Sequence, residues 1–402
     1  MKKRIGHIRL KKIPLLIAAL LLVSCGWLVT SCVEEYWPDL GLKYENAVVV
    51  DGMITNDPGP YTVTLSRSSS VSQPAFLPLV GCEVSIMDNL GNSEILKEES
   101  DGIYRTSPNG IQGEVGISYK LSIQTPNGRH YESEYAYLSP PTTIDSIYYL
   151  PELKEVVDAD HPTNGLQFYI NTGMAEQDTN YYLWRLESSF KFEANHRVMF
   201  IFDGTMERFF PSDSLLTCWW TGSAKEIFTY STEKLSQPVI RNFPLNYVDT
   251  ETKMLSIRYS LLVNQLSITK AAHKFWNSLS EMESESGSMF SRQPYQVRGN
   301  VRCLEDDDEP VLGYFMVAGK SSKRIFVDRP SELDFFYSAK CNLITQELYT
   351  LLWGMVSSWP VLLAGQVTEN GYVPALTADQ GCVDCREEYN GATLQQPDFW
   401  IE

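Results

Sequence analysis

The sequence predicts a mainly β protein, in which a β-sandwich is followed by a larger β-rich domain with one or two helices. Aromatic residues, which favour strands, make up 12% of the 402 residues. The chain also has 25 glycines and 21 prolines, which are common turn residues. Short β-branched segments alternate with these turns along most of the chain, and that pattern is typical of sandwiches.

Residues 1–31 are predicted to be a signal peptide rather than part of the fold. Residues 1–12 contain six basic side chains and no acidic one, and the apolar run Ile13–Val23 follows. A basic segment before a short apolar run is typical of secretory signal peptides. The alternative is a single membrane anchor over Ile13–Val29, but the polar Ser24 interrupts that stretch.

A lipid attachment site is predicted where this signal ends. A small residue followed by cysteine, as at Cys32, resembles the lipidation site of bacterial lipoproteins, and Cys25 is the alternative. We favour Cys32 because the polar chain begins directly after it, so that residues 32–41 form a lipidated tether. The acidic residues behind Cys32 resemble the surface-export signal of Bacteroidetes lipoproteins. The sequence therefore predicts a protein held on the outer face of the outer membrane by covalent lipid, with no other cofactor.

The net charge of the chain excludes two classes of binding partner. Lys and Arg number 33 against 50 Asp and Glu, so the formal net charge is −17. Without residues 1–31, which carry six basic residues, the net charge becomes −23. Nucleic-acid binding needs basic surface that neutralises phosphates, so this class is excluded. Attachment to anionic lipid through a polybasic surface is excluded for the same reason.

The first domain, residues 42–140, is predicted to be an immunoglobulin-like or carboxypeptidase-regulatory-like β-sandwich. Its strand segments are β-branched runs bounded by turn residues, and they cover 47–55, 61–66, 82–88, 94–97, 103–106, 119–124 and 130–137. Asn127-Gly128, before the last segment, is a strong hairpin signal because both residues tolerate positive φ. This number of short strands in about 100 residues fits a sandwich.

The second domain, residues 141–402, follows a stiff linker at Pro140-Pro141, because paired prolines favour extended backbone. A strand series starts at Ile144, and further strand-like segments cover 166–171, 180–188, 197–202, 256–265 and 311–317. An added hairpin or loop is expected within 203–250.

Two segments of this domain have helical periodicity. The first covers 267–283, with Ser267 as a suitable N-cap; its apolar residues recur every three or four positions at Ile268, Ala271, Phe275, Leu279 and Met282. The second covers 345–356, where one face would carry Leu348, Leu351, Leu352 and Met355.

Six cysteines remain after the lipidated segment, and an even number in an exported chain predicts up to three disulfides. The candidates are Cys82, Cys218, Cys303, Cys341, Cys382 and Cys385, and their pairing stays open. Free buried thiols and a zinc site around Cys382–Cys385 are the alternatives. A single CxxC without a second ligand pair is weak evidence for zinc.

Trp219 and Trp220 are candidate binding residues for a ligand or a protein partner. Adjacent strand residues point to opposite faces, so one of the two rings is expected to be exposed, although a packing role in the core is the alternative. The other tryptophans, Trp184, Trp276, Trp353, Trp359 and Trp400, are expected to fill the core.

No metal centre or catalytic residue is predicted. Asp306, Asp307 and Asp308 lie in the densest acidic run and are weak candidates for calcium, with a solvated loop as the alternative. Asp158–Gly165 has a passing likeness to a calcium loop but is expected to be a turn. HExxH, HxxEH, GxSxG, P-loop and GxGxxG motifs are absent from the sequence, so the protein is not expected to be an enzyme.

An ordered set of short motifs resembles the DUF4249 family of Bacteroidetes lipoproteins over nearly the whole mature chain. The motifs are Val48–Gly52, Cys218–Tyr230, Pro244–Val248, Tyr259–Leu261, Phe275-Trp276, Gln293-Pro294, Gly299–Val301, Val311–Phe315, Cys382–Cys385, Gly391–Thr393 and Pro397–Trp400. Where the family usually has two glycines near its end, this chain has Gly391-Ala392. The family name carries no established catalytic residues, so none is transferred.

The resemblance implies an accessory lipoprotein that works beside a TonB-dependent outer-membrane receptor, either in ligand capture or as a component of the complex. A structural or adhesive protein of the cell surface is the alternative, and an enzyme acting on extracellular polymer is a third class.

Overall fold

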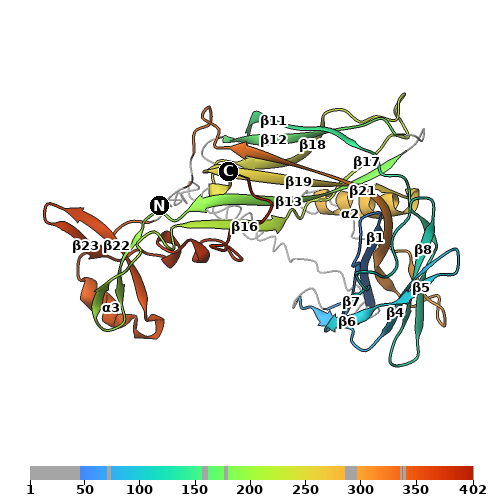
Figure 1. Ribbon diagram of the computed structural model, residues 1–402, viewed down its shortest axis with the longest axis horizontal. Helices are drawn as coiled ribbons and strands as arrows, with labels where there is room; N and C mark the ends of the chain where they lie inside the picture. The colour runs from blue at the N-terminus through green and yellow to red at the C-terminus, as the bar shows by residue number, and fades with distance from the viewer. Residues whose placement is uncertain are drawn as a thin grey trace, which may run out of the picture. The chain divides into compact units, whose positions relative to one another are not determined.

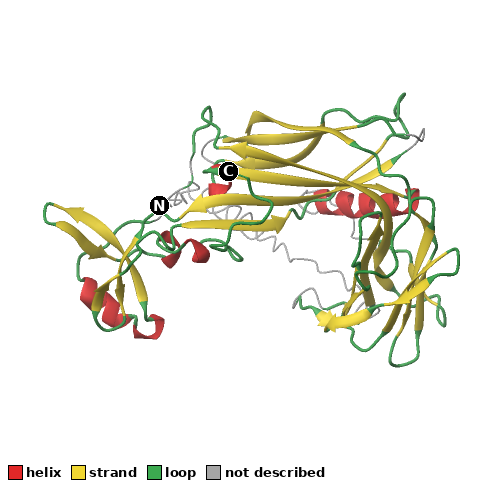
Figure 2. Ribbon diagram, in the orientation of Figure 1, coloured by secondary structure: helices red, strands yellow, loops and turns green. Residues whose placement is uncertain are grey.

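Strands dominate the fold, as predicted (Figures 1 and 2). The computed structural model describes residues 46–69, 74–155, 162–175, 180–285, 297–335, 337 and 341–401. The predicted signal peptide, the two candidate lipidation cysteines and the tether lie outside these residues. So does the first half, 158–161, of the calcium-like segment at 158–165. Of the helices in the described residues, none is long and apolar enough to span a membrane.

The largest sheet has ten strands and runs in the order β16-β13-β19-β21-β1-β2-β7-β6, with β17 also paired to β13 and β3 to β2. Its strands are β1 (Val48–Thr55), β2 (Thr62–Arg67), β3 (Leu77–Pro78), β6 (Lys97–Ser100), β7 (Ile103–Arg105), β13 (Tyr181–Glu193), β16 (Thr217–Ser223), β17 (Phe228–Ser231), β19 (Arg258–Ile268) and β21 (Val311–Asp328). The sheet therefore takes strands from both predicted domains.

The long strand β21 joins these two parts of the chain. Its first half, from Val311 to Ala318, pairs in parallel with β1, and its second half, from Gly319 to Asp328, pairs antiparallel with β19. The predicted boundary between 42–140 and 141–402 therefore does not separate two sheets. Side chains of the first half alternate between two cores, because Phe315 packs in the sandwich and Met316 packs under the helix α2 (Lys270–Glu285).

A β-sandwich forms mainly from residues of the predicted first domain, and β20 and the first half of β21 join it from the predicted second domain. Its second sheet has six strands, β4 (Glu83–Asp88), β5 (Ser93–Ile95), β8 (Ser118–Gln124), β9 (His130–Ser133), β10 (Ala136–Tyr137) and β20 (Val301–Cys303). Val50 and Val63 of the large sheet pack against Ile86 and Leu121 of this sheet in one buried cluster. Alternate residues of these strands are buried, as a sheet with one face in a core requires.

A three-stranded sheet covers the other half of the large sheet (Figure 1). It consists of β11 (Ile144–Lys154), β12 (Thr163–Thr172) and β18 (Phe243–Asp249). Phe168 of β12 packs against Tyr259 of β19, with ring centroids 5.5 Å apart. Trp184 of β13 lies in the same cluster and is 1% exposed. Aromatic residues are thus six of the twenty buried residues of this second core.

The helix α2 (Lys270–Glu285) begins three residues later than predicted. Ser267 is the penultimate residue of β19 and is buried, where its hydroxyl accepts a hydrogen bond from the Thr142 amide at 3.2 Å. The prediction of Ser267 as N-cap is therefore wrong. Thr269 takes that role, since its hydroxyl accepts a hydrogen bond from the Ala272 amide. The apolar face of α2 packs on β21 through Phe275.

Four further strands and a short helix form what we call the outer module. Its strands are β14 (Val198–Phe202), β15 (Met206–Arg208), β22 (Val361–Thr368) and β23 (Gly371–Ala375), and its helices are α3 (Leu348–Gly354) and the 3-10 turn η3 (Val356–Ser358). The predicted helix at 345–356 is therefore confirmed in a shorter form. The remaining 3-10 turns are η2 (Lys253–Leu255), η4 (Gln380–Cys382) and η5 (Cys385–Glu387).

Candidate functional site

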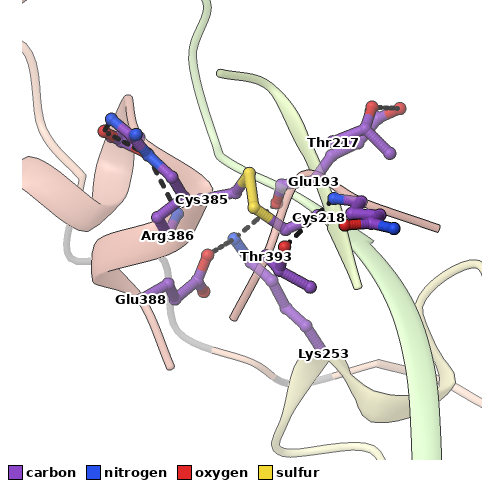
Figure 3. Close-up of a disulfide and its surroundings, with 10 residues drawn as sticks. Glu193, Thr217, Cys218, Lys253, Cys385, Arg386, Glu388 and Thr393 are labelled. Carbon is purple, nitrogen blue, oxygen red and sulfur yellow. Dashed lines mark hydrogen bonds and ion pairs between the residues drawn. A yellow bond between two sulfur atoms is a disulfide. The ribbon is translucent and has the colours of Figure 1, made fainter. Parts of the chain in front are cut away.

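Two disulfides fix the C-terminal segment, residues 377–401. Cys385 bonds to Cys218 of β16, 167 positions away in the sequence, and both residues are fully buried (Figure 3). Cys382 bonds to Cys341. The two cysteines of the CxxC motif thus have different partners and neither has a thiolate for a metal, so the zinc alternative is wrong.

The remaining two candidates, Cys82 and Cys303, are free thiols, so the expected maximum of three disulfides is not reached. Cys82 directly precedes β4 and Cys303 ends β20, and β8 and β9 lie between these two strands. Strands separated by three strand spacings lie about 14 Å apart. This is about twice the largest Cα–Cα distance that a disulfide can span. Burial raises the pKa of both thiols, which favours their protonated form.

A buried ion pair lies beside the Cys218–Cys385 disulfide (Figure 3). Lys253 of η2 donates to Glu388 Oε2 at 2.8 Å, to the Glu193 carbonyl at 2.9 Å and to Asn195 Oδ1 at 2.8 Å. Burial raises the pKa of Glu388, and the hydrogen bond from Lys253 opposes that rise. The pair therefore joins β13, η2 and the C-terminal segment at one point.

Among the described residues that line the cavity next to this pair, Lys253 is the only cation. It has a volume of about 290 Å³ and is lined by Lys253, Glu388, Tyr337 and Asp379, among others. All three N–H groups of the Lys253 ammonium are already engaged. These contacts anchor the C-terminal segment to η2 and β13.

The structure places Trp219 and Trp220 against the C-terminal segment. The backbone of Trp219 exchanges two hydrogen bonds with Thr393, of 2.8 and 2.9 Å. The Trp220 indole donates to the Asn390 carbonyl at 3.0 Å, and its ring lies 5.3 Å from that of Phe190. Both tryptophans are half-buried. Their contacts support a packing role, and binding of a ligand by either residue stays a prediction.

The acidic run at 305–309 is tied to strand β9 by its two ends. Glu305 accepts a hydrogen bond from the His130 amide at 3.0 Å and contacts the His130 ring nitrogen Nδ1 at 2.7 Å. These two bonds lower the pKa of Glu305 to about 2, and the bond from the His130 amide has the larger effect. Glu309 contacts Tyr131 and Arg129.

The three aspartates between these ends are exposed and do not gather around one point. The Asp308 amide donates to Asp306 Oδ1 at 3.1 Å, which closes a local turn. Among the described residues, no group of three or more His, Cys, Asp or Glu side chains could hold a metal ion. The arrangement therefore matches the solvated loop that was the alternative for Asp306, Asp307 and Asp308.

Aromatic side chains form the core of the outer module. Phe202 of β14 lies edge-on to Tyr349, Trp353 and Trp359, at centroid distances of 6.1, 6.0 and 5.2 Å. Leu352 of α3 is fully buried beside them. This packing holds α3 on the four-stranded sheet.

The same module presents an exposed apolar surface that the sequence reasoning missed. Tyr349 and Trp353 are one helical turn apart on α3, and each is 57% exposed. Val356 lies further along the chain, and Tyr372 and Val373 of β23 are also exposed. Tyr349 and Val373 line a common groove of about 420 Å³. Adjacent strand residues point to opposite faces, so only one of the two β23 side chains can share a surface with α3, and Val373 is the one that lines the groove. We call Tyr349, Trp353 and Val373 the aromatic face.

The segment that carries the aromatic face contains few charged residues. Residues 342–378 contain no Lys or Arg and only two acidic residues, Glu347 and Glu369. Trp353 was expected to fill the core, and that expectation is wrong because its ring caps Phe202 from outside. Large exposed apolar side chains that lie together can mark interaction sites, so this face is the strongest candidate for binding a partner.

A family model matches residues 33–324, and its description is domain of unknown function, DUF4249. The match covers more than two thirds of the 402 residues. The chain belongs to the DUF4249 family. In this DUF4249 protein the matched residues include the sandwich and β21 as far as Arg324, whereas α3, β22 and β23 lie beyond the match. No curated protein matches the chain significantly.

Proposed function

We propose that this DUF4249 protein is a non-catalytic lipoprotein on the outer surface of the outer membrane, where it is an accessory of a TonB-dependent transporter and docks on it through the aromatic face. Lipid on Cys32 would hold the protein at the membrane. A basic segment, a short apolar run and a small residue before Cys32 support this anchor. Attachment by charge is ruled out because the mature chain is strongly acidic.

The aromatic face is the observation that carries the proposal. Trp and Tyr dominate the energetic hot spots of protein interfaces, where each contributes about 2 kcal/mol or more. Trp353 and Tyr349 are already held in place by their contacts with Phe202, so a partner would bind them at a small cost in side-chain entropy. The scarcity of charge in residues 342–378 also lowers the cost of removing water from this surface.

Replacing the two central aromatic residues is expected to remove the transporter from the complex. In a Tyr349→Ser/Trp353→Ser variant, affinity should fall at least about 30-fold per residue, since each hot spot is worth about 2 kcal/mol. The measurement is co-purification of the TonB-dependent transporter with tagged full-length protein from outer membranes. Leu90→Ser/Leu153→Ser is the matched control, because these leucines are 69% and 63% exposed elsewhere and their loss should leave binding unchanged.

A second variant separates loss of docking from loss of folding. Thr350→Lys/Val373→Lys adds charge at two exposed positions that line the same groove as Tyr349, so it should block docking while the module stays folded. If the unaltered protein recovers no TonB-dependent transporter, the proposal fails. A deletion strain that loses surface attachment but grows normally on every nutrient would then favour the structural or adhesive alternative.

A further inference from the structure

A second cavity lies at the sandwich end of the molecule, between α2 and the chain that leads into β20. Its volume is about 510 Å³, which is within the usual range for small-molecule sites of about 300–1,000 Å³. Phe275 and Tyr314 line it with ring centroids 4.9 Å apart, and Val297 and Val301 add apolar surface. Both rings are 7% exposed, so the floor suits the apolar body of a ligand.

Three basic side chains line the same cavity: Lys274 of α2, Arg298, and Arg302 of β20. In the part of the chain that the structure describes, none of them has a hydrogen bond or an ion pair. Glu134 is the one acidic residue among the described lining residues, which leaves a net charge of +2 there. Residues 286–296, which connect α2 to Val297, contain one Arg and no acidic residue, so they supply no carboxylate.

This excess of cations is unusual for the molecule. The chain has 50 acidic and 33 basic residues, whereas three exposed cations and one acidic residue line this cavity among the described residues. Cations collected at one concave site without counter-charge attract an anion to it. The lining of the cavity therefore differs from the average of the chain in the sign of its charge.

The backbone that carries the two arginines is held rigidly. Asn300 donates from Nδ2 to the Phe315 carbonyl at 2.8 Å and accepts from the Phe315 amide at 2.9 Å. Gly299 lies against β21 so closely that a Cβ atom would meet the Gly313 carbonyl oxygen at 1.8 Å. This segment therefore holds the backbone of Arg298 and Arg302 in place before a ligand arrives, which lowers the cost of binding.

We infer that this cavity binds a small organic anion, with a carboxylate or phosphate headgroup on an apolar body. Guanidinium groups bind both headgroups through paired, charge-assisted hydrogen bonds. The apolar body would lie against Phe275 and Tyr314. The inference does not depend on docking to a transporter, because the cavity is formed by α2, β20 and β21 and does not include the aromatic face.

Calorimetry on the purified full-length protein in detergent tests the inference with four probes. 2-Naphthoate and 2-naphthyl phosphate should bind, and their relative affinity identifies the preferred headgroup. Uncharged 2-naphthalenemethanol lacks the anionic headgroup and inorganic phosphate lacks the apolar body. Each should therefore bind at least about tenfold more weakly. Affinity for the anionic probes should fall as salt is raised. Equal binding of naphthoate and the alcohol would overturn the inference.

An Arg298→Gln/Arg302→Gln variant locates the site. Each lost charge-assisted contact should weaken binding of the anionic probes at least about tenfold. Lys97→Gln/Lys225→Gln is the matched control, since it removes two exposed cations elsewhere and should leave the affinity unchanged. If the arginine variant binds as tightly as the unaltered protein, or the lysine control loses as much, the inference is wrong. The arginine variant should still co-purify with the transporter, because the arginines lie outside the aromatic face. Loss of anion binding is thereby distinguished from loss of docking.

Discussion

A Lys253→Met variant is expected to lose about 3–5 kcal/mol of unfolding free energy at pH 7, which is the usual loss when one partner of a buried ion pair is removed. The Lys253 side chain is 8% exposed and that of Glu388 is 23% exposed. Methionine keeps most of the aliphatic volume but donates no hydrogen bond. Glu388 then remains as a largely buried carboxylate without its cation, and the Glu193 carbonyl and Asn195 each lose a donor. Urea unfolding measures the loss.

The size of this loss is expected to grow with pH. Burial raises the pKa of Glu388, and Lys253 opposes the rise, so the variant should have a still higher pKa at this carboxyl. A folded-state pKa above the unfolded value contributes stability below the unfolded pKa, and that contribution disappears as pH rises through the folded pKa. The difference in unfolding free energy between the two proteins should therefore be larger at pH 8 than at pH 5.

Two further variants test whether the unpaired Glu388 carboxylate causes this loss of stability. Lys270→Met breaks the ion pair of Lys270 with Glu233, which is 2.8 Å long but well exposed, and it should leave the melting temperature nearly unchanged. Lys253→Met/Glu388→Met replaces both partners by apolar groups and should recover much of the stability. A double variant as unstable as Lys253→Met alone would contradict a role for the unpaired carboxylate.

Local sequence pattern predicted most strands, and it failed where pairing rather than composition fixes the structure. The β-branched residues of Val311–Val317 predicted the first half of β21, because that half is buried. The strand continues to Asp328 through Lys320, Ser321, Ser322 and Lys323, a polar run without strand signal. Those residues are extended because each pairs with β19. Long-range pairing of this kind also places strands of both predicted domains in one sheet.

The candidate sites, too, could be predicted from the sequence only where local pattern decides the structure. A shared face for Leu348, Leu351, Leu352 and Met355 follows from helical spacing, and Leu348 and Leu352 are indeed buried, but Leu351 is 39% exposed. Which flank of a helix meets a sheet depends on the partner strand, here β14, which lies 146 or more positions earlier. Cysteine pairing depends on the same information, since Cys218 and Cys385 meet only after the sheet has formed.

Removing the Cys218–Cys385 disulfide is expected to lower the unfolding free energy by up to about 5 kcal/mol. A cross-link restricts the unfolded chain in proportion to the logarithm of the loop it closes, and a separation of 167 residues gives about this value in the chain-entropy model. The 41-residue separation of Cys341–Cys382 gives about 4 kcal/mol in the same model. Cys218→Ala/Cys385→Ala should therefore be less stable than Cys341→Ala/Cys382→Ala in urea unfolding.

Loss of the Cys218–Cys385 disulfide, which closes the longer loop, should also be visible in tryptophan fluorescence. The Cys385 end holds the C-terminal segment beside Cys218, where the segment bonds to Trp219 and Trp220 through Thr393 and Asn390. Loss of that disulfide should loosen these contacts, so the tryptophan emission of the Cys218→Ala/Cys385→Ala variant should shift to the red under native conditions. The Cys341→Ala/Cys382→Ala variant is the matched control and should shift less. Equal stability and unchanged emission in both variants would show that hydrogen bonds and packing alone hold the C-terminal segment on β16.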